Sequence, residues 1–255
     1  MIDIHSHILP DVDDGAQSEQ ESLEMAYAAI EEGIDTIVAT PHYKNGQWDN
    51  VKLDIEAKVN ALNRFFEENS VPLQVLPGQE SRIHGELIQG IDAGDVLTIN
   101  HSHYVFIEFP SDAVPRYSGQ LLYDLQMKGY KPVIVHPERN RYLRENPSVM
   151  YNFVKKGAYA QLTAGALTGH FGRKVKKFSE ELIDANLIHL IASDAHNVQS
   201  RSFHLKDAYA RINDRYGREM ETVFKENARF VIDDEPLYAE PPEHVRKKKR
   251  FGLFE

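Results

Sequence analysis

The sequence predicts an α/β protein with a single, closed or nearly closed barrel of parallel strands. Short apolar, β-branched runs alternate with amphipathic stretches from one end of the chain to the other. This rhythm is typical of strand–helix units, which build a parallel sheet. No linker-like change of composition interrupts it before the C-terminus. One domain is therefore expected over residues 1–240, followed by a basic tail over residues 241–255.

Seven strands are expected, because seven apolar runs have the length and β-branched content of buried strands. They cover Ile2–His5, Thr36–Thr40, Leu73–Leu76, Tyr104–Phe109, Pro132–Val135, Tyr159–Thr163 and Ile188–Ser193. The segments between them carry helix start and stop signals. Ser18 and Glu21 have the spacing of a capping box, and Gly33 marks the end of that helix. The segment 146–157 opens with an Asn-Pro pair and closes with glycine in the same way.

The composition excludes several classes of function. The chain of 255 residues has no cysteine, which excludes disulfides, thiolate metal sites, iron–sulfur clusters and enzymes with a cysteine nucleophile. Lys and Arg number 29 against 39 Asp and Glu, a formal net charge of −10, and an acidic surface argues against nucleic acid as the main partner. No apolar run approaches the roughly 20 residues that span a bilayer. No leader sequence is recognised, so we expect a cytoplasmic protein that is not transmembrane.

Six of the seven expected strands end in His, Asp or Glu. These ends read His5-Ser6-His7, Thr40-Pro41-His42, Gly78-Gln79-Glu80, Ile107-Glu108-Phe109, Val135-His136-Pro137 and Ser193-Asp194-Ala195-His196. In a β/α barrel the carboxyl ends of the strands form the active-site face. A carboxylate at the end of an apolar strand is costly unless it is paired or binds a metal. The repeated pattern therefore predicts a metal centre at this end of the barrel.

The residue types narrow the chemistry of this centre. His, Asp and Glu without sulfur suit Mn, Fe or Zn, whereas carboxylates alone would suit Mg or Ca. The candidates are too many for one ion, so we expect a cluster of two or three. Ions about 3.5–4 Å apart can clamp both the attacking and the leaving oxygen of a displacement, and they make hydroxide available near neutral pH. The predicted reaction is metal-assisted hydrolysis, with phosphoesters as the leading substrate class.

These strings resemble the motifs of the PHP (polymerase and histidinol phosphatase) superfamily over nearly the whole chain. More narrowly, the sequence is similar to the bacterial CpsB/YwqE-type tyrosine phosphatases. This similarity rests on His5-Ser6-His7-Ile8-Leu9-Pro10, Asp13-Asp14-Gly15, Thr40-Pro41-His42, Glu108-Phe109-Pro110 and His136-Pro137-Glu138-Arg139. It implies the PHP fold, a distorted (β/α)7 barrel similar to a TIM barrel, and hydrolysis of phosphotyrosine by a metal-bound hydroxide. The implied partner is a tyrosine-phosphorylated bacterial tyrosine kinase that controls capsule or exopolysaccharide synthesis.

The resemblance also implies a trinuclear metal centre, commonly supported by manganese, with Fe, Zn, Co or Mg as alternatives. By position, one ion would bind His5, His7, Glu80 and Asp194. A second ion would bind Glu80, Glu108 and His136, so that Glu80 bridges the two. The third would bind Asp14, His42 and His196. Other members of the superfamily often have histidine where Glu108 and Asp14 lie, so these two carboxylates add negative charge to the expected centre.

Two arginines are candidates for catalysis and substrate binding. Arg139 follows His136 by three residues and Arg201 follows His196 by five, so both can reach the mouth of the expected centre. A guanidinium fork binds two phosphate oxygens at once. The alternative for each arginine is a salt bridge on the acidic surface. The role of Trp48, on the loop after the second strand, has two alternatives: its ring stacks on an aryl ring of the substrate, or it packs in the core.

Other functions remain open beside the tyrosine phosphatase. The same site would serve a small-molecule phosphatase such as a histidinol-phosphate hydrolase, or a non-catalytic, metal-holding module that binds a kinase. A nuclease is disfavoured by the acidic charge. The basic run Arg246-Lys247-Lys248-Lys249-Arg250 is either a solvated end or a weak contact for anionic lipid or an acidic partner.

Overall fold

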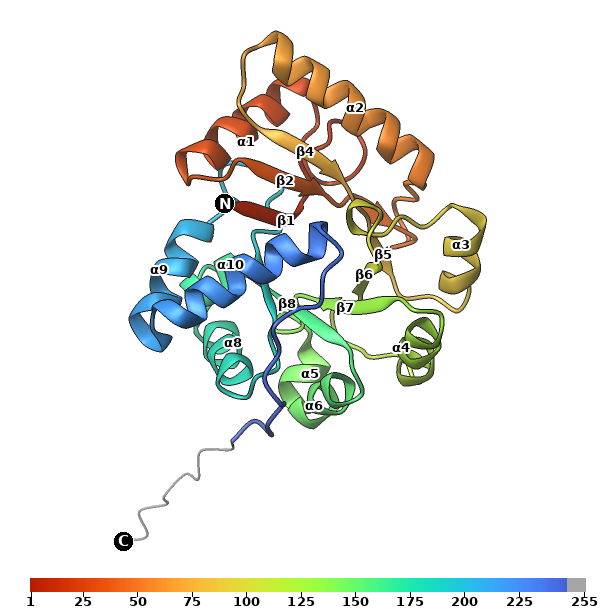
Figure 1. Cartoon of the computed structure of the whole chain (residues 1–255), viewed down its shortest axis with the longest axis vertical. Coiled ribbons are helices and arrows are strands. Elements are labelled where there is room, and N and C mark those ends of the chain that lie inside the picture. The colour runs from red at the N-terminus through yellow and green to blue at the C-terminus, as the bar shows by residue number, and fades with distance from the viewer. Residues whose placement is uncertain (247–255) are drawn as a thin grey trace, which may run out of the picture.

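The structure, a computed structural model, describes residues 1–246, in which parallel strands are surrounded by helices (Figure 1). The strands of this part form two sheets, and every pair is parallel. The smaller sheet has the order β1 (Ile2–Ser6), β2 (Thr36–Ala39), β4 (Gln74–Pro77). The larger sheet has the order β3 (His42–Tyr43), β5 (Glu80–Arg82), β6 (Tyr104–Glu108), β7 (Lys131–Val135), β8 (Tyr159–Thr163), β9 (Leu190–Ala192).

The two sheets are parts of one distorted barrel. The chain passes from β2 to β3 across residues 40–41, and from β4 to β5 across residues 78–79. At the opposite edges of the sheets, the N–H of His7 after β1 donates to the carbonyl of Ala195 after β9 at 2.8 Å. Counting each interrupted strand once, the barrel has seven strand positions. The predicted fold class is therefore confirmed.

Two expected strands are interrupted, and the local sequence explains both breaks. Pro41 has no N–H to donate to a neighbouring strand. Gly78 lies where a side chain would not fit, because a Cβ there would come within 2.7 Å of Val38 Cγ1. After each break a short strand resumes, and its first residue is a candidate metal ligand, His42 or Glu80. The interruptions thus place both side chains at the carboxyl end of the barrel.

Helices cover the outside of the barrel. They are α1 (Glu19–Glu31), α2 (Lys52–Glu68), α3 (Leu87–Ala93), the 3-10 helix η1 (Ile99–His101), α4 (Ser118–Met127), α5 (Arg141–Glu145), α6 (Pro147–Lys155), α7 (Ala164–Thr168), α8 (Arg173–Asp184), α9 (Leu205–Tyr216) and α10 (Arg218–Ile232). The first begins as predicted, because Ser18 Oγ accepts a hydrogen bond from the N–H of Glu21 at 3.2 Å. Gly33 follows its end with a φ of 83°, a conformation that glycine adopts at little cost.

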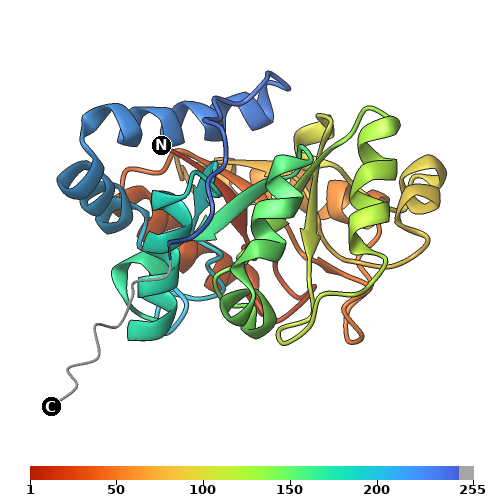
Figure 2. The same cartoon turned by 90° about the horizontal axis from the view of Figure 1, so that it is seen from below.

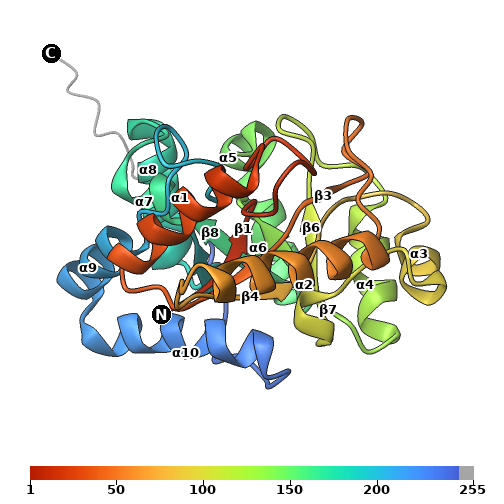
Figure 3. The same ribbon diagram turned by 90° about the horizontal axis from the view of Figure 1, so that it is seen from above.

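Apolar side chains fill the barrel and close its amino end. The inner cluster includes Ile4, Val38, Phe106, Val133 and Leu190 from five strands, with Ala228 and Val231 of α10. Asn100, just before β6, donates its amide N–H to the carbonyl of Ile232 at the end of α10 (3.1 Å). Figures 2 and 3 show α10 along one edge of the molecule. This helix covers the amino end, so the open face of the barrel is formed by the carboxyl ends of the strands.

The chain after α10 packs against α6 and α8. The N–H of Glu243 donates to the carbonyl of Ala185 (2.8 Å), and the ring of His244 stacks on Tyr151 at 3.7 Å. Arg246 pairs with Glu243 at 3.2 Å. The rest of the predicted basic run lies outside the described residues, and the boundary at residue 240 stays a prediction. Within residues 1–246, no helix is long and apolar enough to cross a membrane.

Candidate metal centre and active site

The carboxyl ends of the strands bring the nine candidate metal ligands together. They come from β1 and the loop after it (His5, His7, Asp14), from β3 (His42), β5 (Glu80) and β6 (Glu108), and from the turns after β7 (His136) and β9 (Asp194, His196). Eight are buried, whereas the side chain of Asp14 is 39% exposed. The predicted convergence of these residues is therefore what the structure shows, while their role as ligands stays a prediction.

The backbone is strained at two of these positions. His136 has a φ of 36° and Asp194 a φ of 53°, in a left-handed region that costs a residue other than glycine on the order of 1–3 kcal/mol. Hydrogen bonds hold both turns. The N–H of His136 donates to the carbonyl of Gln161 (2.8 Å), and that of Asp194 donates to the carbonyl of His5 (2.9 Å). Strain of this kind is concentrated at functional sites.

Four side chains form a compact group at the centre. His5 Nε2 lies 3.5 Å from both Glu80 Oε2 and Asp194 Oδ1. His7 Nε2 lies 3.4 Å from the same two oxygens. Tetrahedral ligand atoms that lie about 2.1 Å from one ion are about 3.4 Å apart. His5, His7 and Glu80 form one compact cluster whose spacing fits a single metal ion, and Asp194 Oδ1 lies beside both histidines.

The remaining candidates extend this group to both sides. Asp14 Oδ1 lies 3.2 Å from His42 Nε2 and 3.3 Å from His196 Nε2, and His7 completes a second cluster with these three. A third cluster contains His42, Glu80 and Glu108. His136 Nε2 lies 2.6 Å from Glu80 Oε1. Glu80 thus stands between groups, as a bridging carboxylate would, and His42 joins both outer clusters rather than one.

Buried atoms without a well-directed hydrogen bond show that these residues fit metal ions. Within the described residues, five buried atoms of the centre make no well-directed hydrogen bond: His5 Nε2, His7 Nε2, His42 Nδ1, Glu80 Oε2 and His196 Nε2. Of these, His42 Nδ1 and Glu80 Oε2 lie 2.9 Å apart as an ion pair. A buried polar atom without a well-directed hydrogen bond costs about 1–3 kcal/mol, and ions placed among these five atoms would offset that cost. Nitrogen and oxygen donors without sulfur suit Mn, Fe and Zn. The donor set therefore fits a cluster of divalent ions.

Hydrogen bonds behind the histidines hold their rings in place. His7 Nδ1 lies 2.6 Å from Asp13 Oδ2, and His5 Nδ1 lies 3.0 Å from Gln161 Oε1. Such partners fix the ring orientation and the nitrogen that faces a metal. The sequence alone had assigned no ligand-supporting role to Asp13 or Gln161. One feature of the sequence pointed to Gln161: it is a polar residue inside an apolar strand, β8, which is the one expected strand without a charged residue at its end.

Neighbouring charges shift the pKa values of the carboxyl groups in this centre. Burial and the charge of Glu80 raise the pKa of Glu108 to about 7, although Arg82 opposes this. Burial also raises the pKa of Asp194, but the guanidinium groups of Arg139 and Arg201 outweigh it and hold that pKa well below its usual range. Buried carboxylates this close together require compensating positive charge, which divalent ions would supply.

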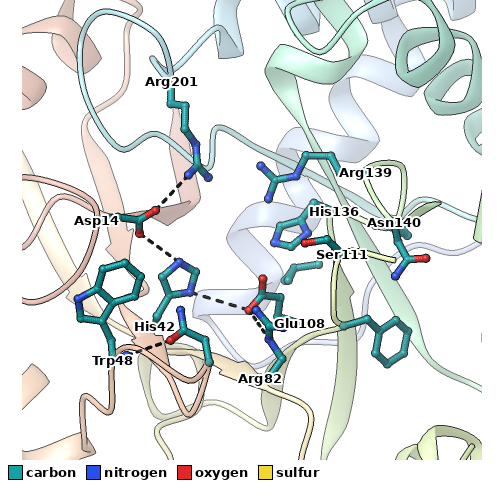
Figure 4. Close-up of a pocket in the computed structure, with 14 residues that line it drawn as sticks. Asp14, His42, Trp48, Arg82, Glu108, Ser111, His136, Arg139, Asn140 and Arg201 are labelled. Atoms are coloured by element: carbon teal, nitrogen blue, oxygen red, sulfur yellow. Dashed lines mark hydrogen bonds and ion pairs between the residues drawn. The ribbon is translucent and has the colours of Figure 1, made fainter. Parts of the chain in front are cut away.

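A cavity of about 360 Å³ opens above this centre. Figure 4 shows labelled residues of its wall: Asp14, His42, Trp48, Arg82, Glu108, Ser111, His136, Arg139, Asn140 and Arg201. Cavities of this size hold small ligands or a single large side chain. The cavity therefore connects the candidate metal centre with solvent and can admit a substrate group.

Both predicted arginines lie at this cavity. Arg139 Nη1 is 2.6 Å from Asp194 Oδ2, and Arg201 Nη2 is 3.1 Å from the same oxygen. Arg201 Nη1 also lies 3.4 Å from Asp14 Oδ2. A third arginine, Arg82, contacts Glu108 Oε2 through its Nε at 2.9 Å and was missed from the sequence. Its one signal was its position two residues after Glu80, on the same side of an extended strand.

The fold and the site define a class, the parallel β/α barrels with a cluster of His, Asp and Glu side chains at the carboxyl ends of the strands. Solved structures of this architecture are similar to the chain. A single-residue mutant of an organophosphorus hydrolase from Deinococcus radiodurans has a TM-score of 0.52 at 16% identity, over 90% of this chain and 92% of that one. Histidinol phosphate phosphatase from Lactococcus lactis has a TM-score of 0.50 at 13% identity, over 93% and 95%. At such identities the likeness shows the fold alone.

The chain belongs to the capsular polysaccharide synthesis family CpsB/CapC, whose model matches residues 1–233. It is 49% identical over 254 residues, all of both chains, to the tyrosine-protein phosphatase YwqE of Bacillus subtilis. It is 31% identical to the tyrosine-protein phosphatase CpsB of Streptococcus pneumoniae, over 92% of this chain and 99% of that one. A crystal structure from work on these two proteins, described as unique metal-dependent tyrosine phosphatases, has a TM-score of 0.95 at 48% identity, over 97% and 100%. The family resemblance is confirmed.

Proposed function

We propose that the protein is a metal-dependent protein-tyrosine phosphatase. The observation that carries this proposal is the cluster of buried histidine nitrogen and carboxylate oxygen atoms beneath a cavity whose wall holds Arg139 and Arg201. Such a site combines metal ligands with anion-binding groups, as hydrolysis of a phosphoester requires. Relatives with the names of tyrosine-protein phosphatases cover the full chain, which supports phosphotyrosine as the substrate.

We assign the nine candidate residues to two or three divalent ions, with Mn²⁺ as the favoured metal. His5, His7, Glu80 and Asp194 would hold the central ion, and Asp14 with the remaining residues would hold the outer ones. When bound, the ions neutralise phosphate charge and make hydroxide available near neutral pH. The donor chemistry supports Mn, Fe or Zn equally well, so Mn²⁺ rests on the family resemblance.

The two arginines would hold the phosphate. In the structure both guanidinium groups contact Asp194 Oδ2, so they point toward the centre rather than toward solvent. The ring of Phe171 lies 5.3 Å from the guanidinium carbon of Arg139, which restricts its motion. A planar guanidinium binds two phosphate oxygens. Positive groups held in position before the reaction stabilise the charge that develops on the phosphate oxygens.

We further propose a tyrosine-phosphorylated bacterial tyrosine kinase of capsule or exopolysaccharide synthesis as the physiological substrate, and the cytoplasm as the compartment. Membership in the CpsB/CapC family supports the link to capsule synthesis. A chain without cysteine needs no oxidising compartment. The histidinol-phosphatase alternative has only a likeness of fold in its favour.

A substrate panel tests the proposed function. Metal-loaded protein is given a phosphotyrosine peptide, the matched phosphoserine peptide and histidinol phosphate, and phosphate release is measured for each. We expect turnover of the phosphotyrosine peptide well above the other two. Preferred hydrolysis of histidinol phosphate would establish the small-molecule alternative, and absence of hydrolysis of all three would support a non-catalytic module.

A further inference from the structure

Trp48 is an aromatic side chain that lies at the wall of the active-site cavity and not in the core. It is partly exposed, lines the cavity, and is the single tryptophan of the chain. Among the described residues it belongs to neither hydrophobic cluster. Its ring is stacked on the ring of His42 with 5.6 Å between centroids and 16° between planes. The alternative of core packing is therefore wrong for this residue.

The loop between β3 and α2 is built to hold this side chain in place. Asn45 Oδ1 accepts hydrogen bonds from the N–H groups of Gln47 and Trp48, each at 3.0 Å. Tyr43 and Asp49 form an antiparallel bridge that closes the loop. An aromatic group on a loop fixed in this way loses little conformational freedom when a ligand packs against it.

Anion-binding residues and the indole of Trp48 lie on different sides of the cavity. Figure 4 shows Trp48 beside His42, whereas Arg139 and Arg201 lie on another side of the cavity. The arginines and the candidate metal ligands would take the phosphate. Trp48 and Phe109 are the two large aromatic side chains of the wall. Phe109 is buried, whereas the indole is partly exposed, so the indole would contact the group that carries the phosphate.

We propose that Trp48 forms an aryl subsite, a stacking surface for the phenyl ring of a phosphotyrosine whose phosphate lies between the metal centre and the arginines. This inference rests on the proposed function and adds the residue that selects aryl over alkyl esters. A phenyl ring stacks on an indole in an offset or edge-to-face arrangement with centroids about 4.5–7 Å apart. The short aliphatic side chain of phosphoserine offers no ring to stack.

Binding can be observed directly, because all tryptophan fluorescence of the protein comes from Trp48. The full-length, metal-loaded protein is titrated with 4-nitrobenzylphosphonate, a non-hydrolysable aryl probe, with propylphosphonate as the alkyl probe and with inorganic phosphate. We expect saturable quenching by the nitroaryl probe, little change with the alkyl probe, and reversal of the quenching by inorganic phosphate. Binding of the nitroaryl probe without any change in fluorescence would overturn the proposal.

Kinetics provide the second test. The ratio of kcat/KM for phenyl phosphate to kcat/KM for a primary alkyl phosphate is measured in each variant, so that leaving-group reactivity cancels between variants. Trp48→Ala should lower this ratio about tenfold, which corresponds to about 1.4 kcal/mol, and Trp48→Phe should retain most of it. Bound metal per chain should stay unchanged. Tyr123→Ala, at an exposed aromatic residue of α4, is the matched control and should keep the wild-type ratio.

The outcomes separate this inference from the proposed function. An unchanged ratio in Trp48→Ala, in a protein that hydrolyses phenyl phosphate, would overturn the aryl subsite and leave the phosphatase intact. Quenching by the nitroaryl probe in a metal-loaded protein that hydrolyses no phosphoester would support the subsite and refute the phosphatase.

Discussion

Asp13→Asn tests how the protein prepares His7 for a metal ion. Asp13 is buried, and both of its carboxylate oxygens accept hydrogen bonds. Oδ2 accepts from His7 Nδ1 at 2.6 Å and from the N–H of His42 at 3.1 Å, and Oδ1 accepts from the N–H of Gly15 at 2.9 Å. An asparagine side chain has one acceptor oxygen and one NH₂ group. Whichever way it is oriented, its NH₂ must face a donor.

The size of the effect follows from these contacts. The substitution removes the negative charge behind His7 and leaves either the N–H of Gly15 or the ring of His7 without an acceptor. Loss of such a partner behind a metal-binding histidine typically costs 10- to 100-fold in metal affinity or activity, or about 1.4–2.7 kcal/mol. We therefore expect weaker metal binding in Asp13→Asn, with the rate recovered in part by excess metal.

The assay measures metal per chain after dialysis, and kcat/KM on a phosphotyrosine peptide as Mn²⁺ is added. Asp11→Asn is the matched control from the same loop, because Asp11 is exposed and its φ of 54° is one that asparagine also tolerates. This control should behave as wild type. Wild-type metal affinity and rate in Asp13→Asn would refute the reasoning that Asp13 prepares His7.

Two further predictions concern Arg139 and His189. Arg139→Ala should lower kcat/KM about 30- to 1,000-fold, equivalent to roughly 2–4 kcal/mol, while the metal content stays unchanged. Arg139→Lys should recover only part of the rate. A normal kcat/KM in Arg139→Ala would show that this residue does not act in the site. Burial lowers the pKa of His189 from 6.5 to about 4, so the unfolded chain binds the proton more tightly and stability should fall as the pH falls through this range. Between pH 6.5 and 4, the free energy of unfolding of the wild type should fall by up to about 3 kcal/mol more than that of His189→Asn, as measured by denaturant unfolding. Parallel pH profiles of the two proteins would contradict the prediction.

The sequence was sufficient for the strand positions and for the convergence of the candidate ligands. Both follow from local rules, because a buried strand needs an apolar run and a charged residue at its end needs a partner. The structure adds that the strand breaks after β2 and after β4, and that it resumes at His42 and at Glu80. Pro41 indicates the first break from the sequence alone. The need for glycine at position 78 depends on a contact with Val38 of a neighbouring strand, and a local sequence pattern cannot reveal that contact.

The supporting contacts could not be predicted for the same reason. Gln161 lies 156 residues after His5 in the chain and meets it only because β8 and β1 belong to one barrel. Arg82 and Glu108 likewise meet through the pairing of β5 with β6. Residue type and spacing identify groups that bind metal or phosphate, whereas the partners that orient those groups are set by the tertiary fold.

Removal and return of metal tests the central claim most directly. Protein dialysed against a chelator is assayed for metal per chain and for hydrolysis of a phosphotyrosine peptide, and Mn²⁺ is then added back. If His5, His7, Glu80, Asp194 and their neighbours bind the ions, removal of metal should abolish most of the turnover. Turnover should recover as two to three ions per chain return. Full turnover in protein that holds almost no metal would contradict the account.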